Sequence, residues 1–207
     1  MTAPFDPNDH DVFLLRQKWT MVINRYYFSL PDAQGREGER FAFVEQARFA
    51  FKEDIRFFTD ESKSTEVLRI RARQRFDPAA RYDITDSNGD KIGEIQKAFA
   101  ASLLRSTYLL FDGHGNQVAE ATERSLAVAV FRRLVGFVPY VGNYAEWLPI
   151  PYHFVFKRGD QVLVNHTRQP WKFNDRYTID CTPDADRTLD RRLVLAAAVG
   201  MDALQAR

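Results

Sequence analysis

Four arginines in one short segment are the strongest candidates for chemistry in this chain. Arg69, Arg71, Arg73 and Arg75 occupy every second position of residues 66–76. Alternate side chains of a β-strand point to the same face, so the four predict a basic stripe about 20 Å long, at roughly 3.3 Å per residue. Guanidinium groups bind phosphate oxygens in pairs, which makes the stripe a candidate phosphate site. Alternatively, the arginines pair with acidic residues on neighbouring strands, such as Glu94 or Glu120.

A second candidate surface is the aromatic segment from Phe137 to Phe156, which holds Trp147 and is interrupted by three prolines. Tryptophan and tyrosine rings favour the interface of a bilayer. The preceding residues 125–135 suit a helix that carries Arg132 and Arg133, and these cations would face an anionic membrane. Alternatively, the segment closes one end of the domain or meets a protein partner.

Signatures of catalysis and of metal binding are absent from the sequence. The four histidines, His10, His114, His153 and His166, do not have metal-ligand spacing. The chain contains no Gly-x-Ser-x-Gly motif and no phosphate-binding Walker loop. Cys181 ends an apolar segment and suits a small packing residue. We therefore expect no enzymatic activity and no cofactor.

Composition narrows the class of protein further. The 29 basic and 28 acidic residues leave a net charge of +1, so no overall field favours nucleic acid. A single cysteine excludes an internal disulfide framework and suits a reducing compartment. The first residues do not join a basic region to an apolar run, so we expect a cytoplasmic protein.

Most of the chain has the pattern of short β-strands separated by polar turns. Residues 1–11 suit a flexible lead-in, residues 12–207 suit one domain, and residues 31–40 suit a polar loop. The predicted strands cover about 20–30, 41–51, 55–59, 66–76, 81–86, 91–97, 103–111, 117–122, 152–158, 161–167 and 175–181.

An internal repeat supports this assignment. Residues 82–94 align with residues 108–120 at an offset of 26, and a shorter copy occupies residues 156–162. Each copy is a strand, a glycine-containing turn and a returning strand, which predicts a series of β-hairpins. Asp86 and Asp112 recur beside the turns, where we expect them to cap the turn rather than to bind a metal.

The C-terminal segment is apolar on every side. Residues 193–201 contain no charge, and nine residues are too few to cross a bilayer, which needs about 20. A helix that is apolar all round is enclosed by protein. We therefore predict a closed β-barrel around a C-terminal helix, a structure with little room for a ligand inside.

These features resemble the Tubby C-terminal-like superfamily, which includes the tubby proteins, the phospholipid scramblases and the LURP-one-related proteins. The similarity covers roughly residues 12–205, and it is carried by residues 15–18, the paired hairpins at 82–94 and 108–120, and residues 189–202. It implies a closed antiparallel barrel of about twelve strands enclosing the C-terminal helix. It also implies phosphoinositide binding, as in tubby, or lipid movement, as in scramblases.

The resemblance also implies a calcium site. Asp180, Asp184 and Asp186 are similar in position and charge to an acidic segment that binds calcium in scramblases. In the alternative interpretation, Thr182 caps the last helix, Pro183 opens it, and the acidic residues face the positive end of its dipole.

Taken together, the sequence predicts a monomeric, non-enzymatic module that binds anionic phospholipid head groups through Arg69, Arg71, Arg73 and Arg75. Such a module would be peripheral at a membrane. Arg132, Arg133 and Trp147 would add membrane contacts. The alternatives are a scramblase-like protein that uses calcium and a scaffold that binds a protein partner. No nucleic acid is expected.

Overall fold

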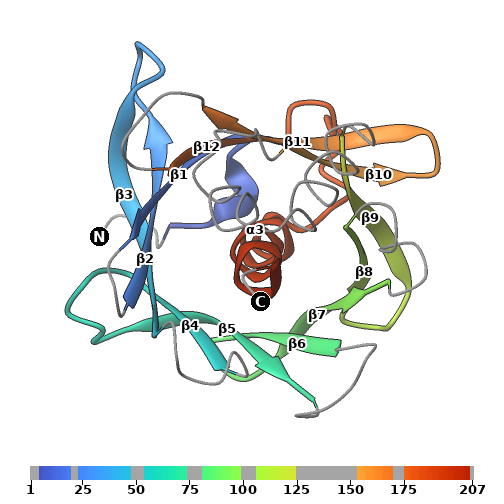
Figure 1. The fold of residues 1–207 in the computed structure, drawn as a ribbon, viewed down its shortest axis with the longest axis horizontal. Helices are drawn as coiled ribbons and strands as arrows, with labels where there is room; N and C mark the ends of the chain where they lie inside the picture. Colours follow the sequence, from blue (N-terminus) through green and yellow to red (C-terminus); the bar gives the residue numbers. More distant parts are fainter. Residues whose placement is uncertain are drawn as a thin grey trace, which may run out of the picture.

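A closed antiparallel barrel surrounds one helix (Figure 1). The computed structural model describes residues 5–19, 23–47, 54–73, 81–98, 106–124, 153–169 and 175–205. Its strands are β1 (Val12–Trp19), β2 (Ile23–Pro31), β3 (Glu37–Ala47), β4 (Asp54–Phe58), β5 (Glu66–Ala72), β6 (Arg81–Asp86), β7 (Lys91–Lys97), β8 (Thr107–Asp112), β9 (Gln117–Glu123), β10 (His153–Arg158), β11 (Gln161–Gln169) and β12 (Asp175–Asp180); a short 3₁₀ helix, η1 (Pro7–Asp9), precedes them and α3 (Arg191–Gln205) follows. Each strand pairs with the next, and β12 pairs with β1 to close the ring. The predicted fold class is confirmed.

Helix α3 lies in the middle of the barrel, as Figure 1 shows. All nine residues of the apolar run 193–201 are buried, which confirms that protein encloses this run on every side. Strand β7 passes close to the helix at Gly93, where a Cβ atom would lie 3.2 Å from Cδ1 of Leu193 and would collide with the carbonyl oxygen of Phe111. Glycine is therefore required at this position, because any side chain would displace the helix or the neighbouring strand β8.

Strand β1 is the main element that the sequence pattern did not reveal. The first predicted strand began at about residue 20, whereas the structure has β1 at Val12–Trp19 followed by β2. The side chains of Phe13, Leu15 and Gln17 are buried inside the barrel. The alternation of apolar and polar residues along β1 is hidden, because Leu14 and Leu15 are adjacent and because the inward-facing residue 17 is a glutamine. Strand β3 also begins earlier than predicted, at Glu37 within the expected loop.

The repeated hairpins have the predicted turns. In the first, the Asp86 carboxylate accepts hydrogen bonds from the backbone N–H groups of Asn88 and Asp90. The Asp112 carboxylate does the same in the second hairpin, and Gly89 and Gly115 both have φ of 87°. The β2–β3 hairpin contains a third copy of this turn, in which the carboxylate of Asp32 accepts from Gln34 and Arg36.

Two predicted segments fall wholly or partly outside the described residues. The helix expected at 125–135 lies outside them, as does the aromatic segment up to Tyr152. In the expected lead-in, the Asp6 side chain caps η1 and the ring of Phe5 stacks on Phe41, with centroids 4.3 Å apart. A domain boundary at residue 12 stays a prediction.

Candidate functional site

Strand β5 presents its arginines on the outside of the barrel. Leu68 and Ile70 are buried against the core, whereas Arg71 is exposed and Arg69 is half-buried. This alternation is the one that the sequence predicted for residues 68–72. Arg73 lies just beyond the end of β5 and is also exposed. Arg75 lies outside the described residues.

Two of these arginines are held by carboxylates on neighbouring strands. Arg69 donates from Nε and Nη2 to the two carboxylate oxygens of Asp54, at 2.7 Å each. Arg73 makes the same two-point contact with Asp83, at 2.8 Å each, and also donates to Glu94 at 2.6 Å. The hydrogen bond from Arg69 lowers the pKa of Asp54, and that from Arg73 lowers the pKa of Asp83. Both carboxylates are therefore charged at neutral pH.

Arg71 occupies a different position. In the strand register it lies between Asp54 on β4 and Asp83 on β6. Each of those carboxylates forms an ion pair with a different arginine, Asp54 with Arg69 and Asp83 with Arg73. Within the part of the chain that the structure describes, Arg71 makes no ion pair. Its guanidinium group is thus an exposed charge in the middle of the stripe.

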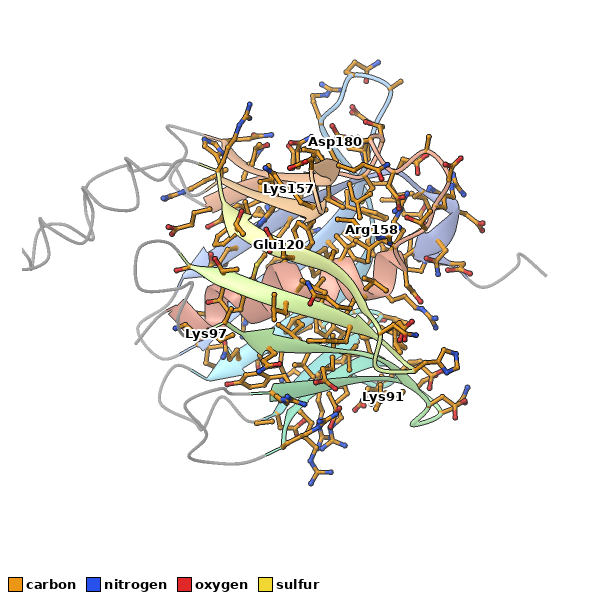
Figure 2. The ribbon with its side chains drawn as sticks, turned by 90° about the vertical axis from the view of Figure 1, so that its right-hand side faces the viewer. Lys91, Lys97, Glu120, Lys157, Arg158 and Asp180 are labelled. Carbon is orange, nitrogen blue, oxygen red and sulfur yellow. The ribbon has the colours of Figure 1, made fainter. Side chains whose placement is uncertain are left out.

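Strand β7 extends the network. Glu94 points outward, yet only 6 % of its side chain is exposed, because it lies among Arg73, Arg81 and Lys91. Of the two expected acidic partners, Glu94 is therefore a partner of the stripe. Glu120 lies on β9, in another part of the wall beside Lys157 (Figure 2).

We call this outer surface of β4–β7 the arginine face. It comprises the cations Arg56, Arg69, Arg71, Arg73, Arg81 and Lys91 and the carboxylates Asp54, Glu66, Asp83 and Glu94. Six cations against four carboxylates leave a surplus of two positive charges, which favours anions at this part of the wall.

The acidic segment before α3 is a structural anchor. Asp184 is 2 % exposed, and one of its carboxylate oxygens accepts from Nη1 of the fully buried Arg191 at 2.7 Å. Burial opposes ionisation, but hydrogen bonds from Thr188 and Arg191 hold the pKa of Asp184 below its usual value. Its oxygens also accept from the backbone N–H groups of Thr188 and Leu189.

The other two predicted calcium ligands, Asp180 and Asp186, are not part of this anchor. Asp180 accepts from the backbone and the hydroxyl of Thr182 and so caps a turn, and Asp186 is exposed. The described residues contain no group of three or more acidic, histidine or cysteine side chains able to hold a metal ion.

The expected start of the last helix is wrong. Helix α3 begins at Arg191, not near Pro183, because the Asp184 carboxylate folds residues 184–189 into turns. Asp190 caps the helix by accepting from the N–H of Arg192, and the side chain of Asn8 accepts from the N–H of Arg191.

The predicted membrane residues Arg132, Arg133 and Trp147 lie outside the described residues.

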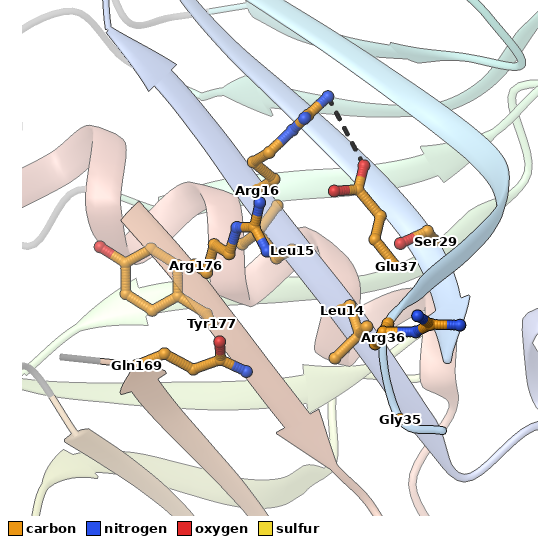
Figure 3. A pocket seen from close by; sticks show the side chains of 10 residues that line it. All are labelled: Leu14, Leu15, Arg16, Ser29, Gly35, Arg36, Glu37, Gln169, Arg176 and Tyr177. Carbon is orange, nitrogen blue, oxygen red and sulfur yellow. Dashed lines mark ion pairs between the residues drawn. The ribbon is translucent and has the colours of Figure 1, made fainter. Parts of the chain in front are cut away.

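A pocket that the sequence did not reveal lies where β1 meets β12 and the β2–β3 hairpin (Figure 3). We call it the closure pocket. It measures about 160 Å³ and is lined by Leu14, Leu15, Arg16, Ser29, Gly35, Arg36, Glu37, Gln169, Arg176 and Tyr177. Arg16 and Arg176 are distant in sequence, and only the closure of the barrel brings them together. A local pattern therefore had no means of indicating the pocket.

The sequence model of one family, LURP-one-related, matches residues 41–202, which include the arginine face and α3 through Asp202. The chain belongs to the LURP-one-related family. This family is part of the tubby-like superfamily, so the predicted resemblance is confirmed. LURP-one-related proteins are not a known enzyme family. Strands β1 and β2, and with them Arg16, precede the matched residues.

No curated protein matches this LURP-one-related chain. Among the described residues, no helix has both the length and the apolar character needed to span a bilayer.

Proposed function

We propose that this protein is a non-enzymatic binding module that recognises anionic phospholipid head groups, of the phosphoinositide type, through the arginine face. The observation that carries the proposal is the exposed guanidinium group of Arg71, which has no ion-pair partner among the described residues and lies between two arginine–aspartate pairs. An anion that approaches Arg71 meets a surface with surplus positive charge.

The architecture supports a site on the outer wall. Helix α3 fills the middle of the barrel, the space in which other small β-barrels hold a ligand. A ligand of this protein would therefore bind to the outer surface of the barrel. The strands β4–β7 form a continuous sheet there, so all of these cations except Arg73 are held on strands rather than on a loop.

The paired arginines can take part without giving up their partners. Arg69 uses Nε and Nη2 to bind Asp54, which leaves the N–H groups of Nη1 for another acceptor. A phosphate bound to Arg71 would find these donors on its flank. The two ion pairs also fix the side chains on either side of Arg71, which lowers the entropy that a ligand has to remove.

Binding of vesicles tests the proposal. Wild-type protein should co-sediment with phosphatidylcholine vesicles that contain a phosphoinositide more strongly than with phosphatidylcholine alone. Each cation near an anionic surface contributes about 1 kcal/mol, so Arg71→Gln should weaken binding about fivefold and Arg71→Glu about thirtyfold. Arg71→Lys should bind at an intermediate level if paired hydrogen bonds to phosphate add to the charge.

Arg71 is a better test position than the whole stripe. Substitution of Arg69 or Arg73 would remove the two-point partner of Asp54 or Asp83 and would disturb the barrel wall. The matched control is Lys157→Gln on β10, which removes one charge from a different part of the wall (Figure 2). Equal binding by wild type and Arg71→Glu, or an equal loss in Lys157→Gln, would show that the arginine face is not the site.

A further inference from the structure

The closure pocket holds two opposed arginines, of which only Arg16 has an ion-pair partner within the described residues. Arg16 on β1 and Arg176 on β12 are directly opposite each other in the strand register. Like charges at opposed positions of an antiparallel pair repel each other. Figure 3 shows Arg176 reaching from β12 toward β1, with the Arg16 side chain turned toward Glu37. An anion between the two guanidinium groups would remove this repulsion.

The protein supplies few acceptors for these arginines. Arg16 has one ion pair, with Glu37 at 3.5 Å, and Glu37 also binds Arg40. Within the described residues, Arg176 has no ion pair. The Nε atoms of Arg16 and Arg176 are both buried and have no hydrogen-bond partner. Buried donors are normally satisfied, so both side chains are short of acceptors within the described residues. Arg176 in particular lines the pocket as a charge without an ion pair there.

Arg16 is nevertheless held in place. Its guanidinium carbon lies 4.9 Å from the centre of the Tyr27 ring, and that of Arg40 lies at the same distance. Contacts of this kind orient a guanidinium group without using its N–H donors. The pocket is therefore organised before a ligand binds.

The β2–β3 hairpin adds charge at the edge of the pocket. Arg36 follows the Asp32 turn and donates from Nε to the Asp32 carboxylate at 3.0 Å. The four arginines at positions 16, 36, 40 and 176 exceed the carboxylates of Asp32 and Glu37 by two charges. This surplus matches the charge of a phosphate monoester at neutral pH, which is about −1.5 to −2.

We propose that the closure pocket is a second anion site that binds a phosphate group, carried either by a small soluble molecule or by a lipid head group. A carboxylate is planar and can be satisfied by one guanidinium group, whereas a tetrahedral phosphate offers oxygens to donors on several walls. Arg16, Arg176 and the Ser29 hydroxyl lie on different walls of this pocket, on β1, β12 and β2. A volume of about 160 Å³ has room for such an anion.

Inorganic phosphate is the first probe. We expect phosphate to raise the melting temperature of the wild-type protein above its value in chloride at equal ionic strength, and to show exchange broadening in phosphorus NMR. Arg176→Gln and Arg16→Gln should each weaken phosphate binding about tenfold, and Arg176→Lys should weaken it less. In chloride, Arg176→Gln should melt no lower than wild type, because it removes the repulsion between opposed arginines.

The second probe separates the two sources of phosphate. Vesicles that contain phosphatidic acid present the same phosphate monoester on a lipid. If these vesicles bind in a manner that depends on Arg176, the site accepts a lipid head group; if only free phosphate binds in that manner, the ligand is soluble. Binding of both probes by Arg16→Gln and Arg176→Gln at the wild-type level would overturn the proposal, as would a phosphate effect no larger than that of chloride.

Lys157→Gln is the matched control for this site. It removes one charge and should bind inorganic phosphate like wild type, because Lys157 lies on β10 and does not line the closure pocket. The two proposals can therefore fail separately. Binding that is lost in Arg176→Gln but kept in Arg71→Gln belongs to the closure pocket, and the reverse pattern belongs to the arginine face.

Discussion

At the scale of single residues, most of the arginines in the described part of the chain have a carboxylate partner, and a few do not. Arg69 and Arg73 are held by carboxylates from adjacent strands, whereas Arg71 and Arg176 have no ion pair within the described residues. The difference follows from position and not from residue type. An arginine on a strand is paired only if the register places a carboxylate within reach that no other cation has taken.

His166 is a buried residue whose protonation should limit stability in acid. Its ring lies between those of Phe154 and Tyr177, and neither ring nitrogen has a hydrogen-bond partner in the described residues. Burial, aided by the charge of His153, lowers the pKa of His166 to about 4. The folded protein therefore keeps this ring neutral, whereas the unfolded chain binds a proton below about pH 6.5.

We predict that His166 makes unfolding easier as the pH falls from 6.5 toward 4, because only the unfolded chain gains a proton in this range. Between pH 7 and pH 5 the expected loss is about 2 kcal/mol, at 1.36 kcal/mol per pKa unit. Urea unfolding of wild type and His166→Phe at both pH values measures it. The variant should lose less stability than wild type, and an equal loss in the two proteins would contradict the prediction.

At the scale of elements, a buried ion pair determines where α3 begins. Arg191 is fully buried in the first turn of the helix and donates to the Asp184 carboxylate, to the Leu189 carbonyl and, at the edge, to Asp11. These contacts join the turn after β12, the start of β1 and the helix. Helix α3 is thereby anchored at one end of the barrel.

We predict that Asp184→Ala lowers the free energy of unfolding by about 3 to 5 kcal/mol, because it leaves the buried Arg191 charge without its main partner. The exposed Asp186 provides the control, and Asp186→Ala should change stability by less than about 0.5 kcal/mol. Chemical denaturation measures both. Similar small effects in the two variants would mean that Arg191 is satisfied without Asp184.

At the scale of the whole molecule, the barrel and its helix form one core. The buried cluster contains residues from the strands around the ring and from α3, including Phe13, Ile70, Leu110, Leu163 and Val199. The helix contributes the centre of this core, so within the described residues it occupies the space where a ligand could lie. Both of our proposals therefore place ligand binding away from the middle of the barrel.

Leu193 tests this arrangement. We predict that Leu193→Ala costs about 2 to 5 kcal/mol of unfolding free energy, since it removes a 1 % exposed side chain next to Gly93 and leaves a cavity. The adjacent Arg192 is more than a third exposed, and Arg192→Ala should cost less than about 1 kcal/mol. A helix that lay on the surface would instead give two small and similar losses.

Much of the architecture could be predicted because its signals are local. The hairpin turns depend on an aspartate and a glycine three residues apart, and the apolar run at 193–201 alone indicated an enclosed helix. The alternation at residues 68–72 placed Arg69 and Arg71 on one face. Strand β1 was missed because its inward side includes Gln17 and because Leu14 and Leu15 are adjacent.

The sequence by itself therefore determined the order of the hairpins, the enclosed helix and the face on which the β5 arginines lie, since each depends on neighbours along the chain. Only the tertiary structure decided which arginines are neutralised and that Arg16 meets Arg176. Those relations depend on strand register and on closure between β1 and β12, which are set by packing over the whole ring.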